Sequence, residues 1–134
     1  MAKITEEMKE VVAKTRTPVL ATSTPNGKPN AVPIAFTKVL SDDEILLMDN
    51  FMNKTRQNID QNPMVAVSAW ATDAPNGYQF KGKARVESSG EIYKEGTKWV
   101  QSRVPQFTPK AAIILKVDEI YMICGGTDAG KRVD

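Results

Sequence analysis

A cationic residue and a hydroxyl residue, Lys54 and Thr55, open a segment of helical character that follows an apolar run and a short turn. The apolar run, residues 45–48, is typical of a strand, and Pro63 ends the helical segment. The start of a helix presents unpaired N–H groups and partial positive charge, so it attracts anions. With an ammonium group and a hydroxyl donor added, this pattern predicts a phosphate site, and a phosphate implies a nucleotide or a cofactor.

The same segment can also be interpreted as an ordinary surface helix that Asn53 caps at its N-terminus. A cation in the first turn opposes the helix dipole, which is unusual for a helix that only has to be stable. Both interpretations, a phosphate site and a capped surface helix, remain open from the local pattern alone.

The chain has no histidine and a single cysteine, Cys124. This composition excludes Ser-His-Asp and Cys-His catalysis and the usual zinc sites. Cys124 lies in an apolar run, so we expect a buried core residue rather than a nucleophile. If the protein performs chemistry, a bound cofactor is therefore expected to supply the reactivity.

Length and charge limit the partners of the protein. The 134 residues carry 18 lysines and arginines against 16 acids, and a net charge of +2 argues against a nucleic-acid surface. No apolar run approaches the ~20 residues that span a bilayer, and the first residues lack the apolar segment of a signal peptide. We expect one domain over residues 1–134, a cytoplasmic location, and neither a nucleic acid nor a membrane as partner.

Apolar periodicity and turn signals predict ten elements. Helices are expected at 3–15, 53–62 and 91–103, and strands at 19–24, 29–39, 44–50, 64–70, 78–88, 111–117 and 119–124. Strands joined by tight turns imply antiparallel pairing, and a short chain covers its sheet edges by closing into a barrel. The prediction is a mainly β, α+β fold: a six- to seven-stranded antiparallel barrel with three short helices.

Single residues add local detail. Pro33 has no N–H, so its strand is expected at a sheet edge or beside a ligand. Gly82 indicates a bulge or a close backbone approach. Residues 125–132 have the spacing of a phosphate-binding P-loop, but Arg132 stands where a serine or threonine is needed and no helix can follow. We interpret this tail as a frayed terminus or as a cover for a cofactor groove.

The order of these motifs carries a family resemblance. Residues 19–29 form a strand ending in Ala-Thr, an Asn-Gly turn and a proline; residues 30–36 form the next strand. Residues 54–59 and 62–65 follow as a phosphate-binding helix with its next strand, and residues 80–84 as a strand with an internal glycine. Over nearly its whole length the chain resembles the pyridoxamine phosphate oxidase-like family of FMN-binding split barrels.

The resemblance implies a role for each matching position. It places the FMN phosphate on Lys54 and Thr55, with Asn58 nearby. It places backbone contacts to the flavin ring on two strand segments: Val32, Pro33 and Ile34, and Met48, Asp49 and Asn50. It also implies a homodimer with FMN at the subunit interface. A barrel of this size has no interior room for a flavin, so a groove on its outside must hold the ligand.

Several functions fit this resemblance. The first is an FMN-dependent oxidoreductase or electron carrier that works with a small-molecule donor or acceptor. The second is a reductase that uses the deazaflavin coenzyme on the same fold, and the third is a non-enzymatic flavin-binding or sensor protein. The chain lacks the basic C-terminal segment by which the oxidase holds pyridoxamine phosphate. Trp70 and Trp99 are either flavin-stacking residues or core residues.

Overall fold

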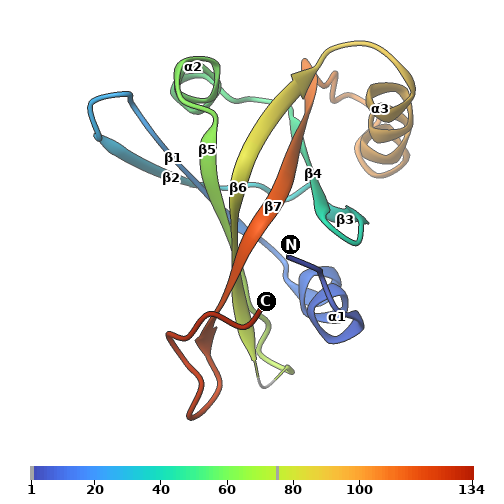
Figure 1. Cartoon of the computed structure of the whole chain (residues 1–134). Coiled ribbons are helices and arrows are strands. Elements are labelled where there is room, and N and C mark those ends of the chain that lie inside the picture. Colours follow the sequence, from blue (N-terminus) through green and yellow to red (C-terminus); the bar gives the residue numbers. More distant parts are fainter. Residues whose placement is uncertain (1, 75) are drawn as a thin grey trace.

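The computed structural model describes residues 2–74 and 76–134, which form three helices and seven antiparallel strands (Figure 1). In chain order the elements are α1 (Glu6–Lys14), β1 (Val19–Ser23), β2 (Pro29–Pro33), β3 (Thr37–Ser41), β4 (Glu44–Asp49), α2 (Lys54–Gln61), β5 (Met64–Ala69), β6 (Gly77–Glu87), α3 (Glu91–Arg103) and β7 (Ala111–Cys124). This confirms the predicted mainly β fold class. Among the described residues, no helix combines the length and the apolar character that a bilayer crossing requires.

The strands form one sheet in the order β2-β1-β5-β6-β7-β4-β3. The edge strands, β2 and β3, are consecutive in the sequence, and only residues 34–36 join them. The Ile34 N–H donates to the Pro18 carbonyl at 2.9 Å, and the Phe36 carbonyl accepts from the Met48 N–H at 3.0 Å. This short link brings the two edges of the rolled sheet together without a ladder between them in the described residues, which is the geometry of a split barrel.

The prediction of one strand over residues 29–39 is wrong, because the chain forms two strands there, β2 and β3. Pro33 fixes its own φ and offers no N–H, and the N–H of Ile34 leaves the ladder for the Pro18 carbonyl. The chain therefore turns after Pro33 and crosses to the opposite edge. The expectation that Pro33 lies on an edge strand is confirmed.

The prediction of two strands over residues 111–124 is also wrong, since β7 is continuous. Lys81 pairs with Glu119 and Gly82 with Val117, which leaves Asp118 as the extra residue of a bulge. A Cβ atom on Gly82 would lie 1.9 Å from the Lys116 carbonyl oxygen. The predicted close backbone approach at Gly82 is therefore confirmed.

Alternating side chains divide the core into two parts. On β4, Ile45 and Leu47 point into the barrel, whereas Leu46 and Met48 join a second cluster beneath α3. α1 contributes Met8, Val11 and Val12 to the barrel interior. Because side chains fill that interior, the space for a ligand must lie elsewhere.

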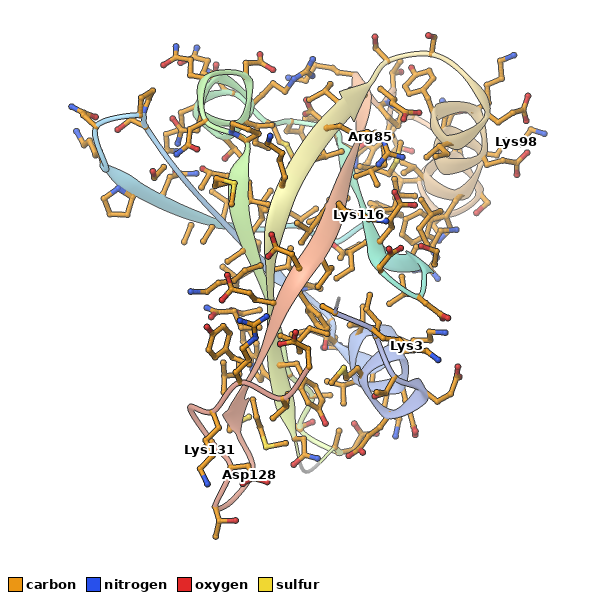
Figure 2. All side chains as sticks on the ribbon, viewed as in Figure 1. Lys3, Arg85, Lys98, Lys116, Asp128 and Lys131 are labelled. Carbon is orange, nitrogen blue, oxygen red and sulfur yellow. The ribbon has the colours of Figure 1, made fainter. Side chains whose placement is uncertain are left out.

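The outer face of the long β6–β7 pair carries paired charges. Lys81, Lys83 and Arg85 are exposed, as predicted. Arg85 contacts Glu44 at 2.7 Å, and Lys116 of β7 pairs with Asp43. Figure 2 shows Arg85 and Lys116 on these two central strands. Ion pairs therefore connect the acidic turn between β3 and β4 to the two central strands of the sheet.

The C-terminal tail is ordered along β7. The Met122 N–H donates to the Lys131 carbonyl at 2.9 Å and the Val133 N–H to the Ile120 carbonyl at 2.8 Å. The tail lies at the opposite end of the β6–β7 pair from α2 (Figure 1). The tail is therefore not a frayed terminus, because it is hydrogen-bonded to β7. It also does not cover the groove beside α2 in its own chain, because it lies at the other end of the sheet (Figure 1). The prediction of a buried Cys124 is wrong as well, because β7 extends past the barrel core and leaves this thiol exposed.

We expect the tail to confer acid resistance through Asp134. Hydrogen bonds from Arg132 Nε at 2.7 Å and from the Ile120 N–H at 3.0 Å lower the pKa of Asp134 to about 2. The resulting stabilisation is complete above the unfolded pKa near 3.8 and is lost as the pH falls towards 2. Asp134→Asn should remove roughly 1 kcal/mol at neutral pH and move the acid-unfolding midpoint upwards.

Asp128→Asn is the matched control in acid titrations followed by circular dichroism. Asp128 and Lys131 form an exposed pair at 3.4 Å near the tip of the tail (Figure 2). Such a pair contributes little, so this variant should unfold like the parent protein. Identical acid midpoints for Asp134→Asn and the parent would refute the role of Asp134.

Candidate cofactor site

An open groove of about 410 Å³ lies outside the barrel core, where the link between β2 and β3 passes the end of β4. Its size lies within the range of small-molecule sites. We call it the split groove, and its lining is Val32, Pro33, Ile34, Ala35, Phe36, Met48, Asn50, Phe51, Met52, Asn53, Lys54, Thr55 and Phe107. One side of the groove is apolar, and the other is the first turn of α2.

The start of α2 lines the groove with Asn53, Lys54 and Thr55, and the N–H groups of a first helical turn have no acceptor within the helix. Asn53 occupies the N-cap position, but its side chain makes no capping hydrogen bond. The first turn contains no acidic residue. Within residues 2–74 and 76–134, no carboxylate lies within 4.0 Å of the Lys54 ammonium group. The geometry thus lacks the side-chain cap that the surface-helix interpretation requires and retains the features of an anion site.

A buried polar network lies beneath this turn. The Asn30 amide nitrogen donates to the hydroxyl oxygens of Thr55 at 3.0 Å and Thr22 at 3.2 Å. Asn58 donates from its own amide to the Thr22 hydroxyl at 3.0 Å. Thr22, Thr55 and Asn58 are all buried. The network joins β1, β2 and α2, and only Thr55 of the four residues reaches the groove lining.

A fully buried carboxylate, Asp49, holds the loop 50–53, which forms part of the groove lining. Its Oδ1 accepts from the Met52 N–H at 2.9 Å, and its Oδ2 lies 3.0 Å from Arg56 Nη1. Lys110 donates from Nζ to the Met52 carbonyl at 2.5 Å and lies 3.8 Å from Asp49. The loop is therefore tied both to α2 and to the start of β7.

Aromatic rings form the far wall of the groove. Phe51 is 75% exposed, and its ring meets Phe107 edge-to-face at 4.9 Å. Phe36 lies behind, 6.4 Å from Phe107 and 5.4 Å from Trp99. Both Trp99 and Trp70 lie outside the groove lining. An exposed phenylalanine beside a groove suits a planar apolar ligand or a second protein surface.

Comparison with known proteins assigns the family. A sequence model described as pyridoxamine 5'-phosphate oxidase matches residues 4–124. The chain belongs to the pyridoxamine 5'-phosphate oxidase family. An uncharacterized protein of Methanocaldococcus jannaschii is a relative, 38% identical over an alignment of 136 positions that covers 99% of this chain and 89% of the relative.

Solved structures share the fold of this family member. HupZ of Group A Streptococcus superposes with a TM-score of 0.83 at 30% identity, over 95% of this chain and 99% of HupZ. An FMN-binding protein of Syntrophomonas wolfei gives a TM-score of 0.80 at 18% identity, over 91% and 87% of the two chains. A heme binding protein of Mycobacterium smegmatis, 18% identical with a TM-score of 0.71 over 96% of this chain and 55% of its own, shows the same fold. The fold is thus common to proteins that bind different cofactors.

The structure brings together most of the residues that the resemblance to this family suggested. Val32, Pro33, Ile34, Met48, Asn50, Lys54 and Thr55 all line the split groove. Asp49 and Asn58 do not: the first lies under the loop 50–53, and the second lies in the network under α2. Both support groove residues from behind.

Sequence reasoning missed the aromatic wall. Phe51 lies three residues before Lys54, and an aromatic residue so near a predicted phosphate site could have identified it. Phe107 lies in a loop far along the chain and carries no local signal. Arg56 and Lys110 were missed too, because only the fold shows that they share the Asp49 carboxylate.

Proposed function

We propose that this family member binds FMN in the split groove, with the phosphate on the first turn of α2 and the ring against the apolar side. The supporting observation is the contrast between the two sides of one groove. An uncapped helix start with Lys54 and Thr55 suits a phosphate, and the lining from Val32 to Phe36 together with Phe51 suits a planar ring. The Oδ1 atom of Asn50 is buried without a hydrogen-bond partner among the described residues, as a polar group awaiting a ligand would be.

The proposed activity is that of an oxidoreductase or electron carrier. Bound FMN would supply hydride and one-electron chemistry. The chain itself binds and orients the cofactor, and the backbone of residues 32–36 shields one side of it. Lys54 is the one ionisable residue in the groove lining as described. Because Lys54 belongs to the phosphate end, we assign no acid or base catalyst, and protons would exchange with water through the open groove.

We further propose a cytoplasmic homodimer with the cofactor between the subunits. The exposed ring of Phe51 and the uncovered edge strand β2 lie beside an open groove that a second subunit could wall. The dimer predicts a solution mass of twice the chain mass of 14.8 kDa. Light scattering of the flavin-bound protein tests this, and a monomer with fully bound flavin would refute it.

The decisive experiment is a flavin titration of the purified protein. The fluorescence of FMN should be quenched on binding, and its absorption should change to the visible spectrum of a bound flavin. A protein that binds no FMN would overturn the proposal. The deazaflavin coenzyme, titrated in parallel, tests the second candidate ligand. Rapid reduction of bound FMN by a nicotinamide or another donor supports turnover, whereas bound flavin that no donor reduces supports a sensor.

Lys54→Ala is expected to weaken the binding of FMN but not that of riboflavin, since only FMN carries the phosphate. The lost charge-assisted contact should reduce the affinity for FMN by about 1.5–3 kcal/mol. Lys94→Ala, which removes an exposed lysine of α3, is the control and should leave both affinities unchanged. Equal losses for FMN and riboflavin would show that Lys54 does not contact the phosphate.

A further inference from the structure

The Asn30 side chain fixes the hydrogen-bonding direction of two hydroxyl groups. Its amide nitrogen carries two hydrogens and lies 3.0 Å from the Thr55 Oγ1 and 3.2 Å from the Thr22 Oγ1. An amide NH₂ group donates and does not accept. Both hydroxyl oxygens must therefore accept from Asn30, and each keeps one hydrogen of its own to donate elsewhere.

Thr55, whose hydroxyl hydrogen remains available to a ligand, lines the split groove. Thr55 is 3% exposed, belongs to the first turn of α2 and lines the groove. Within residues 2–74 and 76–134, its hydroxyl donates to no protein acceptor. A buried hydroxyl that already accepts one hydrogen bond gains most from an anionic acceptor for its second.

The far side of the network holds Asn30 in place. The Thr22 oxygen accepts from Asn30 and also from Asn58 at 3.0 Å, and both Thr22 and Asn58 are buried. The Asn30 amide is therefore held from β1 and α2 at once. Rotation of this amide would break contacts on both sides of it.

We infer that Asn30 is a positioning residue that makes Thr55 a dedicated hydrogen-bond donor to the terminal phosphate of the ligand. Asn30 does not line the groove, so it acts through Thr55 rather than by contact. The consequence is selectivity: the groove prefers a planar ring compound that ends in a phosphomonoester over the same compound without it. This inference rests on the proposed FMN site and deepens it.

The test compares FMN with riboflavin in three variants. Asn30→Leu leaves the Thr55 hydroxyl free to rotate and should raise the FMN Kd by ~5–10-fold, with less than ~2-fold change for riboflavin. Thr55→Val should raise the FMN Kd by ~10–30-fold. Asn30→Asp keeps the shape of the side chain, but its carboxylate only accepts hydrogen bonds. It should therefore accept the hydrogen of the Thr55 hydroxyl, which then no longer donates to the phosphate. The affinity for FMN should fall at least as much as in Asn30→Leu.

A double-mutant cycle shows whether Asn30 acts through Thr55. In the Thr55→Val background, Asn30→Leu should have no further effect on FMN, because its intermediary is gone. Additive losses would overturn the inference. So would equal losses of FMN and riboflavin in Asn30→Leu, since a merely structural role predicts that result.

Asn62→Leu is the matched control for folding. Asn62 makes the same kind of contact, from its amide to the Ser23 hydroxyl at 3.2 Å, but at the C-terminal end of α2. It should lower stability without changing the ratio of FMN to riboflavin affinity. If the parent protein binds neither flavin, the proposed function fails; if it binds FMN and Asn30→Leu retains the parent ratio, only this inference fails.

Discussion

Asp49→Ala is expected to lower the free energy of unfolding by about 3 kcal/mol, because it removes the buried partner of two cations. Arg56 and Lys110 lose a carboxylate that is 0% exposed, and the Met52 N–H loses its acceptor. The two cations are 28% and 52% exposed, so water hydrates them in part and keeps the loss below that of a fully buried pair. Urea unfolding followed by circular dichroism measures the change.

Two further variants separate the contributions of Asp49. Asp49→Asn keeps an acceptor for the Met52 N–H and should lose less than the alanine variant does. Asp60→Ala removes the other, more exposed partner of Arg56 and should change stability by less than about 0.5 kcal/mol. A loss in Asp60→Ala as large as that in Asp49→Ala would contradict the special role of the buried carboxylate.

The Asp49 variants should also affect ligand binding in a way that differs from Lys54→Ala. Asp49 holds the loop 50–53, which lines the groove at Asn50 and Phe51. A loosened loop weakens contacts to the ring, so FMN and riboflavin should lose affinity to a similar extent. Parallel titrations of the two ligands therefore distinguish support of the loop from recognition of the phosphate.

Gly82→Ala is expected to destabilise the protein by about 3 kcal/mol through a backbone clash. The added Cβ would lie 1.9 Å from the Lys116 carbonyl oxygen and 2.9 Å from its carbon, and backbone cannot move aside as a flexible side chain can. β6 and β7 would have to separate at their bulge, in the middle of the longest ladder of the sheet. Denaturant unfolding should show a lower midpoint with a similar slope.

Gly27→Ala is the comparison for Gly82→Ala. Gly27 has a φ of +92° in the β1–β2 turn, but nothing lies within 4 Å of its Cβ position. Gly27→Ala should lower the free energy of unfolding through backbone strain alone, by about 1 kcal/mol. If both glycine variants lost the same amount, steric contact at Lys116 would not explain the role of Gly82.

Local chemistry made much of the fold predictable. The turn signal at Pro25, Asn26 and Gly27 predicts the first hairpin. The alternation of apolar and charged residues around Phe80 predicts β6 with one solvent-exposed and one buried face. Pro33 indicated an edge because a missing N–H is visible in the sequence. Such signals depend on a residue and its immediate neighbours, and these are the features that a sequence displays.

The errors arose where a distant partner decides the outcome. The chain leaves the ladder at Ile34 because the Pro18 carbonyl takes its N–H, and β7 continues past Asp118 because Lys81 and Gly82 absorb the extra residue. The same holds for the site. Lys54 and Thr55 were recognisable from their order, whereas the placement of Phe107 and the burial of Asp49 depend on contacts that only the folded chain makes.

The link over residues 34–36 both closes the sheet and lines the groove. Any ligand bound there braces the two free edges of the barrel against each other. Binding to the native state alone adds about 2.7 kcal/mol to stability at a hundredfold excess over Kd. Absence of such a ligand would consequently loosen β2 and β3 first, and unpaired edge strands invite pairing with other chains. In such a barrel, resistance to aggregation would therefore depend on the supply of the ligand.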